Sequence, residues 1–154
     1  MTNYEGLLNE AHSQGIKVIE MDLGTNNPCG KCINNIIFIN DRVSTKDKYC
    51  ILAEEIGHYK LNYGNITNQN KIKNRKQELI ARRWGYDKNI GIVGIINAFE
   101  YGCRSRFEIA EYLNVTEQYL DEAINYYSQK YGTMYQIDNY IIYFTPKLYI
   151  GKAF

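Results

Sequence analysis

One stretch of the sequence, residues 44–64, combines a strongly apolar helix pattern with three ionisable side chains near its middle. Its apolar residues recur at helical spacing in two stripes, which are Cys50, Ala53, Gly57, Leu61 and Leu52, Ile56, Tyr59, Tyr63. So wide an apolar surface predicts a helix that is buried on most sides. Glu54, Glu55 and His58 lie within it. Because burying adjacent carboxylates is costly unless a cation or hydrogen bonds compensate them, this helix predicts a bound metal ion.

The spacing of the three ionisable residues agrees with a metal site. Glu54 and His58 are four residues apart and therefore lie on one face of the helix, whereas Glu55 is turned by about 100°. This is the layout of the His-Glu-x-x-His motif, in which two histidines bind zinc and the glutamate is the general base. A third ligand must come from another segment. We expect Glu78, because the small Ala81 one turn later would let its helix approach the first closely.

Several strings resemble the ImmA/IrrE metallo-endopeptidase family, in particular its prophage and mobile-element members. They are Cys50-Ile-Leu-Ala-Glu-Glu-Ile-Gly-His58-Tyr, Tyr63-Gly-Asn-Ile66, Glu78-x-x-Ala81-x-x-Trp84-Gly-Tyr86, Phe107–Val115 and Tyr140–Phe144. The resemblance covers most of the chain. It implies a zincin-like core followed by a small helix-turn-helix-like portion. It also implies cleavage, in the cytoplasm, of a transcriptional repressor that silences a prophage or mobile element.

The sequence departs from the family motif at one position, where Glu54 replaces the first histidine. The chain has only two histidines, and the other one, His12, lies in the N-terminal segment. Two carboxylates and one imidazole would leave a divalent ion formally neutral, which makes it a weaker Lewis acid. Ligation rich in oxygen also moves metal preference from zinc towards manganese, magnesium or calcium. We expect one divalent ion bound by Glu54, His58 and Glu78, zinc first, with manganese or another ion as the alternative.

Two functions follow from this motif, and the sequence leaves both open. The first is a zinc-type metallo-endopeptidase, with Glu55 as its catalytic base, that cleaves a cytoplasmic regulatory protein such as a prophage repressor. The second is a catalytically weak or silent protein of the same fold that binds a repressor without cutting it. The substrate, the cleaved bond, the oligomeric state and any need for an activator are not readable from the residues.

The pattern along the chain predicts an α+β fold. Helices are expected at 3–14, 44–64, 71–101 with a break near 87, 106–113 and 116–130, and strands at 16–21, 35–39, 134–137 and 140–145. Residues 1–102 are expected to form the zincin-like core, a small sheet with the active-site helices. Residues 103–154 are expected to form a helix-turn-helix-like region and a terminal β-hairpin packed on the core.

Composition narrows the class of partner. The net charge is +1, and the longest uncharged run, residues 89–99, is too short to cross a bilayer. The first residues lack the features of a secretory signal, so we expect a cytoplasmic protein without a membrane partner. Direct DNA binding is not expected, because Glu117, Asp121 and Glu122 on the second helix of the pair would repel phosphates. Cys29-Gly-Lys-Cys32 is interpreted as a turn between two strands.

Overall fold

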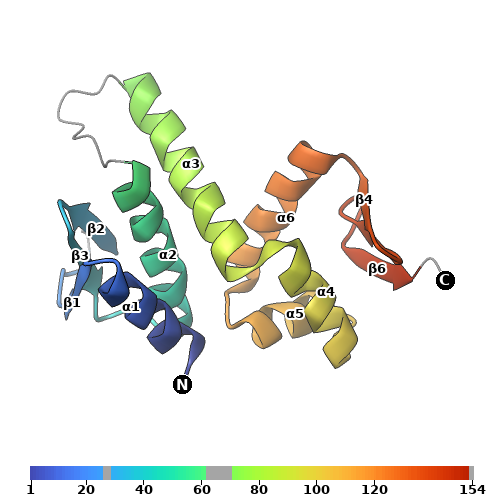
Figure 1. Ribbon diagram of the computed structural model, residues 1–154, viewed down its shortest axis with the longest axis horizontal. Coiled ribbons are helices and arrows are strands. Elements are labelled where there is room, and N and C mark those ends of the chain that lie inside the picture. The colour runs from blue at the N-terminus through green and yellow to red at the C-terminus, as the bar shows by residue number, and fades with distance from the viewer. Residues whose placement is uncertain (26–28, 62–70, 153–154) are drawn as a thin grey trace. The chain divides into compact units, whose positions relative to one another are not determined.

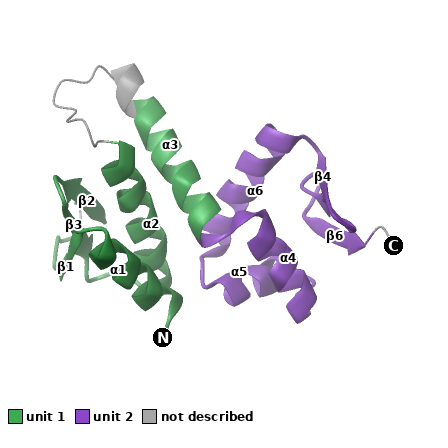
Figure 2. Cartoon of the chain, in the orientation of Figure 1, with its two compact units in different colours: residues 1–88 green, residues 89–154 purple. Residues whose placement is uncertain are grey.

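The computed structural model describes residues 1–25, 29–61 and 71–152, which fall into two compact units, Met1–Lys88 and Asn89–Phe154 (Figure 2). The first unit contains α1 (Asn3–Ser13), β1 (Lys17–Met21), β2 (Gly30–Ile33), β3 (Ile36–Asn40), α2 (Thr45–Leu61) and α3 (Lys71–Asn89). The second contains α4 (Gly91–Tyr101), α5 (Arg106–Leu113), α6 (Glu117–Tyr131), β4 (Met134–Ile137), β5 (Tyr140–Tyr143) and β6 (Tyr149–Lys152). The fold is α+β, as predicted. The division of the chain into 1–102 and 103–154 stays a prediction.

The sheet of the first unit has the strand order β1-β3-β2 (Figure 1). β1 runs parallel to β3, and β2 pairs antiparallel with β3, so that Gly30 lies opposite Ile39 and Cys32 opposite Ile37. The expectation of a turn at residues 29–32 was wrong, because Gly30–Ile33 form an edge strand. This strand is short and has no alternating apolar pattern, so the hydrogen bonds to β3 form it rather than a local preference.

Helix α2 is the central element of this unit. It begins after Ser44, whose hydroxyl accepts a hydrogen bond from the Asp47 amide at 3.1 Å and donates one to the Asp47 carboxylate at 2.8 Å. The predicted helix start is therefore confirmed, whereas the predicted stop at Gly64 lies outside the described residues. α2 packs against α1, β2 and β3, and α3 runs beside it (Figure 1). The shared core is fully buried and includes Leu7, Ala11, Ile37, Ile39, Leu52, Ala53 and Ile56.

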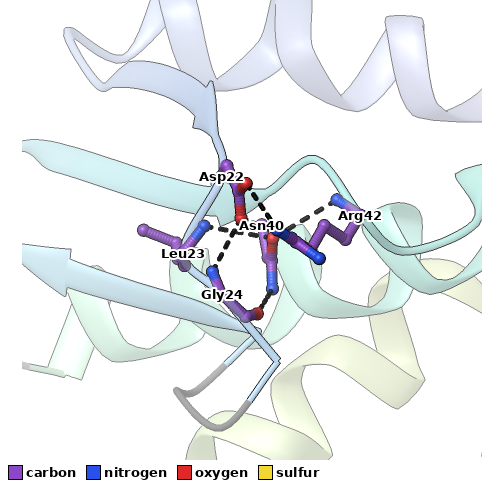
Figure 3. Close-up of polar contacts among 5 residues, drawn as sticks. All are labelled: Asp22, Leu23, Gly24, Asn40 and Arg42. Carbon is purple, nitrogen blue, oxygen red and sulfur yellow. Dashed lines mark hydrogen bonds and ion pairs between the residues drawn. The ribbon is translucent and has the colours of Figure 1, made fainter.

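The buried side chain of Asn40 forms hydrogen bonds with the loop that leads from β1 towards β2 (Figure 3). The Asn40 Oδ1 atom accepts hydrogen bonds from the amides of Leu23 and Arg42 at 3.2 and 3.3 Å, and its Nδ2 donates to the Gly24 carbonyl at 2.8 Å. An Arg42–Asp22 ion pair lies beside this network, with Nη2 and Oδ2 2.8 Å apart. Asn40 is 3% exposed, so its amide replaces water for three backbone groups.

We therefore expect Asn40→Ala to lower the free energy of unfolding by about 2–4 kcal/mol, because it leaves several buried backbone groups without partners. Urea denaturation followed by circular dichroism measures this. Asn35→Ala is the matched control: the Asn35 side chain is exposed and donates one hydrogen bond to the Gly15 carbonyl at 3.2 Å. The control should cost less than about 1 kcal/mol. Equal losses in the two variants would contradict a special role of the Asn40 network.

The second unit follows the predicted order of helices, with one additional strand. Helices α5 and α6 are joined by Asn114, which is left-handed with φ 59°, and by Thr116, whose side chain caps α6. The predicted hairpin of β4 and β5 is present and is extended by β6 to a three-stranded antiparallel sheet. The long helical segment breaks at Gly91 (φ 66°) rather than near Asp87. None of the helices in the described parts of the chain has the length and apolarity needed to span a membrane.

Candidate metal centre

Helices α2 and α3 bring the three predicted ligands together. The His58 Nε2 atom lies 3.2 Å from Oε2 of Glu78 and 3.9 Å from Oε1 of Glu54. One donor atom from each of the three residues lies within 4.8 Å of the other two. Glu54 and His58 share a face of α2, one turn apart, and Glu78 comes from α3. The juxtaposition expected from the sequence is present in the structure, and the role of these residues as ligands stays a prediction.

A close contact between the two helices sets this spacing. A Cβ atom added at Gly57 would lie 2.6 Å from the carbonyl oxygen and 3.0 Å from the Cα of Ala81. Ala81 is fully buried. Since both neighbouring atoms belong to the backbone, only glycine at position 57 allows α2 and α3 to approach this closely. From the sequence Gly57 counted only as part of an apolar stripe, because the residue that it faces is 24 positions further along the chain.

The donor set fits a divalent ion. Catalytic zinc sites have three protein ligands of this kind, with nitrogen and oxygen atoms at about 2.0–2.2 Å from the metal. Tetrahedral ligands at that distance are about 3.3 Å from one another. The observed separations from His58, 3.2 and 3.9 Å, are close to this value. All three donors lie within 4.8 Å of one another, so an adjustment of their side chains would place them around one ion.

Burial and mutual repulsion make the carboxylates of this cluster costly to ionise without a cation. Glu55 is 9% exposed, and its burial, followed by the charges of Glu54 and Glu78, raises its pKa to about 8. Burial is also the main reason why the pKa of Glu54 is raised, and the neighbouring Arg82 opposes this rise. A divalent ion would supply the positive charge that such a cluster lacks.

Strand β2 passes directly beside Glu55. A Cβ atom at Gly30 would lie 2.4 Å from Cγ2 of Ile51 and 3.4 Å from Cγ of Glu55, so glycine allows the strand to approach α2. Cys32 is on the same face of this strand, and its pKa is raised to about 11 by burial and by Glu55. A thiol with this pKa is protonated at neutral pH and is a poor nucleophile. Cys29 and Cys32 are free cysteines. The proximity of this strand to Glu55 was not predicted from the sequence.

Arg82 is a second neighbour that sequence reasoning did not single out. Its Nε atom lies 3.4 Å from Oε1 of Glu54. In the sequence it belongs to a run of basic residues that is typical of an ordinary charged helix face. Its position four residues after Glu78 was the available signal, because residues four apart share one side of a helix.

Comparison with protein families agrees with this arrangement. The family model described as the IrrE N-terminal-like domain (Peptidase_M78) matches residues 11–125, which is well over half of the chain. The chain belongs to this family. The matched region includes both helices of the donor cluster, and the resemblance to the ImmA/IrrE family is thereby confirmed at the level of the family. Membership indicates a metal-dependent peptidase, that is, a hydrolase in general. No curated protein matches the chain.

Proposed function

We propose that this protein is a metal-dependent endopeptidase that acts on a regulatory protein. Glu54, His58 and Glu78 would hold one divalent ion, and Glu55 would be the general base. The observation that carries the proposal is the convergence of the three donors from α2 and α3 next to the buried Glu55. Zinc is the first candidate because catalytic zinc sites use three ligands of these types, and manganese is the alternative for a site with two carboxylates.

The residues of the chain divide the chemistry between them. A bound ion would supply Lewis acidity towards the scissile carbonyl and towards a water molecule. The Glu55 carboxylate would take a proton from the attacking water and return it to the leaving amine. In the metal-free protein, burial raises the pKa of Glu55 to about 8, and the positive charge of a bound ion would lower it again, so that the carboxylate could accept a proton near neutral pH and later release it. Glu54, His58 and Glu78 would hold the ion and so bring its Lewis acidity next to the Glu55 carboxylate.

The proposed substrate is a cytoplasmic transcriptional repressor of a prophage or mobile element. This part of the proposal is supported by the resemblance of the motif strings to the prophage-type members of the family. The acidic residues on α6, Glu117, Asp121 and Glu122, support a protein rather than a DNA partner, because they would repel a phosphate backbone.

A second function is favoured by Glu54 itself. A carboxylate in place of the first histidine adds a negative ligand, which weakens the Lewis acidity of the ion and would leave the protein as a binder of the repressor without hydrolysis.

The experiment that separates the two functions measures metal and cleavage on the same sample. Protein purified without chelator should contain about one equivalent of divalent ion by elemental analysis. It should also cleave a transcriptional repressor of the prophage or mobile element that carries it, and removing the ion with a chelator should abolish the cleavage. Bound metal without cleavage would support the second function, in which the protein binds the repressor without hydrolysing it. Protein that holds no zinc or manganese at millimolar concentrations would contradict both.

A further inference from the structure

Arg82 is placed to interact with the metal centre rather than with solvent alone. It lies one turn after Glu78 on α3, and therefore on the same side of that helix. Its guanidinium reaches across to α2, where Nε is 3.4 Å from Oε1 of Glu54. The same Glu54 oxygen is 3.9 Å from His58. One carboxylate oxygen thus lies between the imidazole of the donor cluster and a permanent positive charge.

The contact between Arg82 and Glu54 changes the total charge around the donor cluster. Glu54 and Glu78 bring two negative charges to the ion, whereas a motif with histidine at position 54 would bring one. The guanidinium cannot lose its proton at any relevant pH, so Arg82 reduces the total again to a single negative charge. The Glu54 side chain is 27% exposed and the Arg82 side chain is 52% exposed, so solvent screens part of this interaction and its effect on ion binding should be modest.

We propose that Arg82 compensates the charge of Glu54 and so gives this centre the net charge of one built on two histidines and a glutamate. Its charge acts on the ion through Glu54, and Arg82 itself does not touch the reacting atoms. The inference rests on the proposed function, because it requires that Glu54, His58 and Glu78 bind an ion. It explains why an arginine lies within hydrogen-bonding distance of a ligand carboxylate, although the positive charge of this arginine weakens ion binding.

The test is the affinity for Zn²⁺ and Mn²⁺, measured by competition with a chromogenic chelator at fixed ionic strength. We expect Arg82→Gln to bind both ions about three- to tenfold more tightly, because one positive charge near the ion is removed. Hydrolysis by this variant should be slower, because a more negative ligand set makes the ion a weaker Lewis acid. Arg82→Lys, which retains the charge, should stay within about twofold of the wild type in affinity.

Lys76→Gln is the matched control, because it removes one positive charge from the exposed face of the same helix. Lys76 is two residues before Glu78 and therefore points to nearly the opposite side of α3. This control should leave the affinity unchanged. A second pair of variants tests the charge balance directly. Glu54→His should bind Mn²⁺ more weakly than the wild type, and Glu54→His combined with Arg82→Gln should recover part of the loss.

Each outcome decides the inference. Weaker ion binding by Arg82→Gln would overturn it, since Arg82 would then act only by holding Glu54 in place. If Arg82→Gln binds the ions with the same affinity as Lys76→Gln, the inference is also overturned, because the Arg82–Glu54 contact is then an ordinary surface ion pair. If the wild type binds neither ion, the proposed function itself fails. If the wild type binds and Arg82→Gln does not tighten binding, only the role of Arg82 fails.

Discussion

Glu55→Gln should reduce peptide hydrolysis by on the order of 10³-fold, and the variant should still bind one equivalent of metal. The amide cannot accept a proton from water, so the general base is lost. The donor cluster is retained, because Glu55 is not one of the three residues that converge within 4.8 Å. Cleavage of the repressor substrate under single-turnover conditions measures the first effect, and competition with a chelator measures the second. Glu10→Gln is the matched control, because Glu10 pairs with Lys88 at the surface, and it should cleave as fast as the wild type.

Glu55→Gln should also change how the stability of the metal-free protein depends on pH. The pKa of Glu55 is raised from 4.5 to about 8, so the folded protein retains a proton that the unfolded chain releases above pH 4.5. Stability should therefore fall by about 1.4 kcal/mol per pH unit between about pH 5 and 8. Glutamine resembles the protonated form, so the variant should be as stable as the wild type at pH 5 and show a smaller loss towards pH 8. Part of the slope will remain, because the pKa of Glu54 is raised too. Identical slopes would show that Glu55 is not buried among like charges.

Gly57→Ala should have the second large effect. Its new Cβ would meet the Ala81 backbone at 2.6 and 3.0 Å, and a backbone cannot turn aside as a flexible side chain can. Helices α2 and α3 must then separate, which moves Glu78 away from His58. We expect the free energy of unfolding to fall by about 2–3 kcal/mol and ion affinity to fall at least tenfold. Urea denaturation and chelator competition measure the two effects.

The control for this substitution is Gly6→Ala in α1. A Cβ atom there would lie 3.9 Å from the Met1 sulfur, which is an ordinary contact. Alanine at that position should be neutral or stabilise the helix by up to about 1 kcal/mol, because alanine is the better helix former. A Gly57→Ala variant that binds metal as tightly as the wild type would show that the helix contact does not set the geometry of the centre.

The sequence predicted the elements whose signals are local. Helix α2 follows from its apolar stripes and from Ser44 as a cap, and α5 and α6 follow from their spacing and from Thr116. Strands β2 and β6 were missed, because each contains a glycine and lacks an alternating apolar pattern, so that pairing with β3 and β5 rather than a local preference forms them. The break of the long helical segment was placed a few residues too early, because the segment contains Gly85, Gly91 and Gly94, and of these only Gly91 adopts a positive φ.

The sequence alone determined the chemistry that this protein can offer: two adjacent carboxylates and a histidine on a buried helix, and a second helix with Glu78 beside a small residue. Helical periodicity fixes which side chains share a face, so these facts need no coordinates. Only the tertiary structure decided that Gly57 meets Ala81, that β2 passes beside Glu55, and that Arg82 reaches Glu54. Each is a contact between residues 21 or more positions apart, and such contacts arise from packing and pairing that no local pattern encodes.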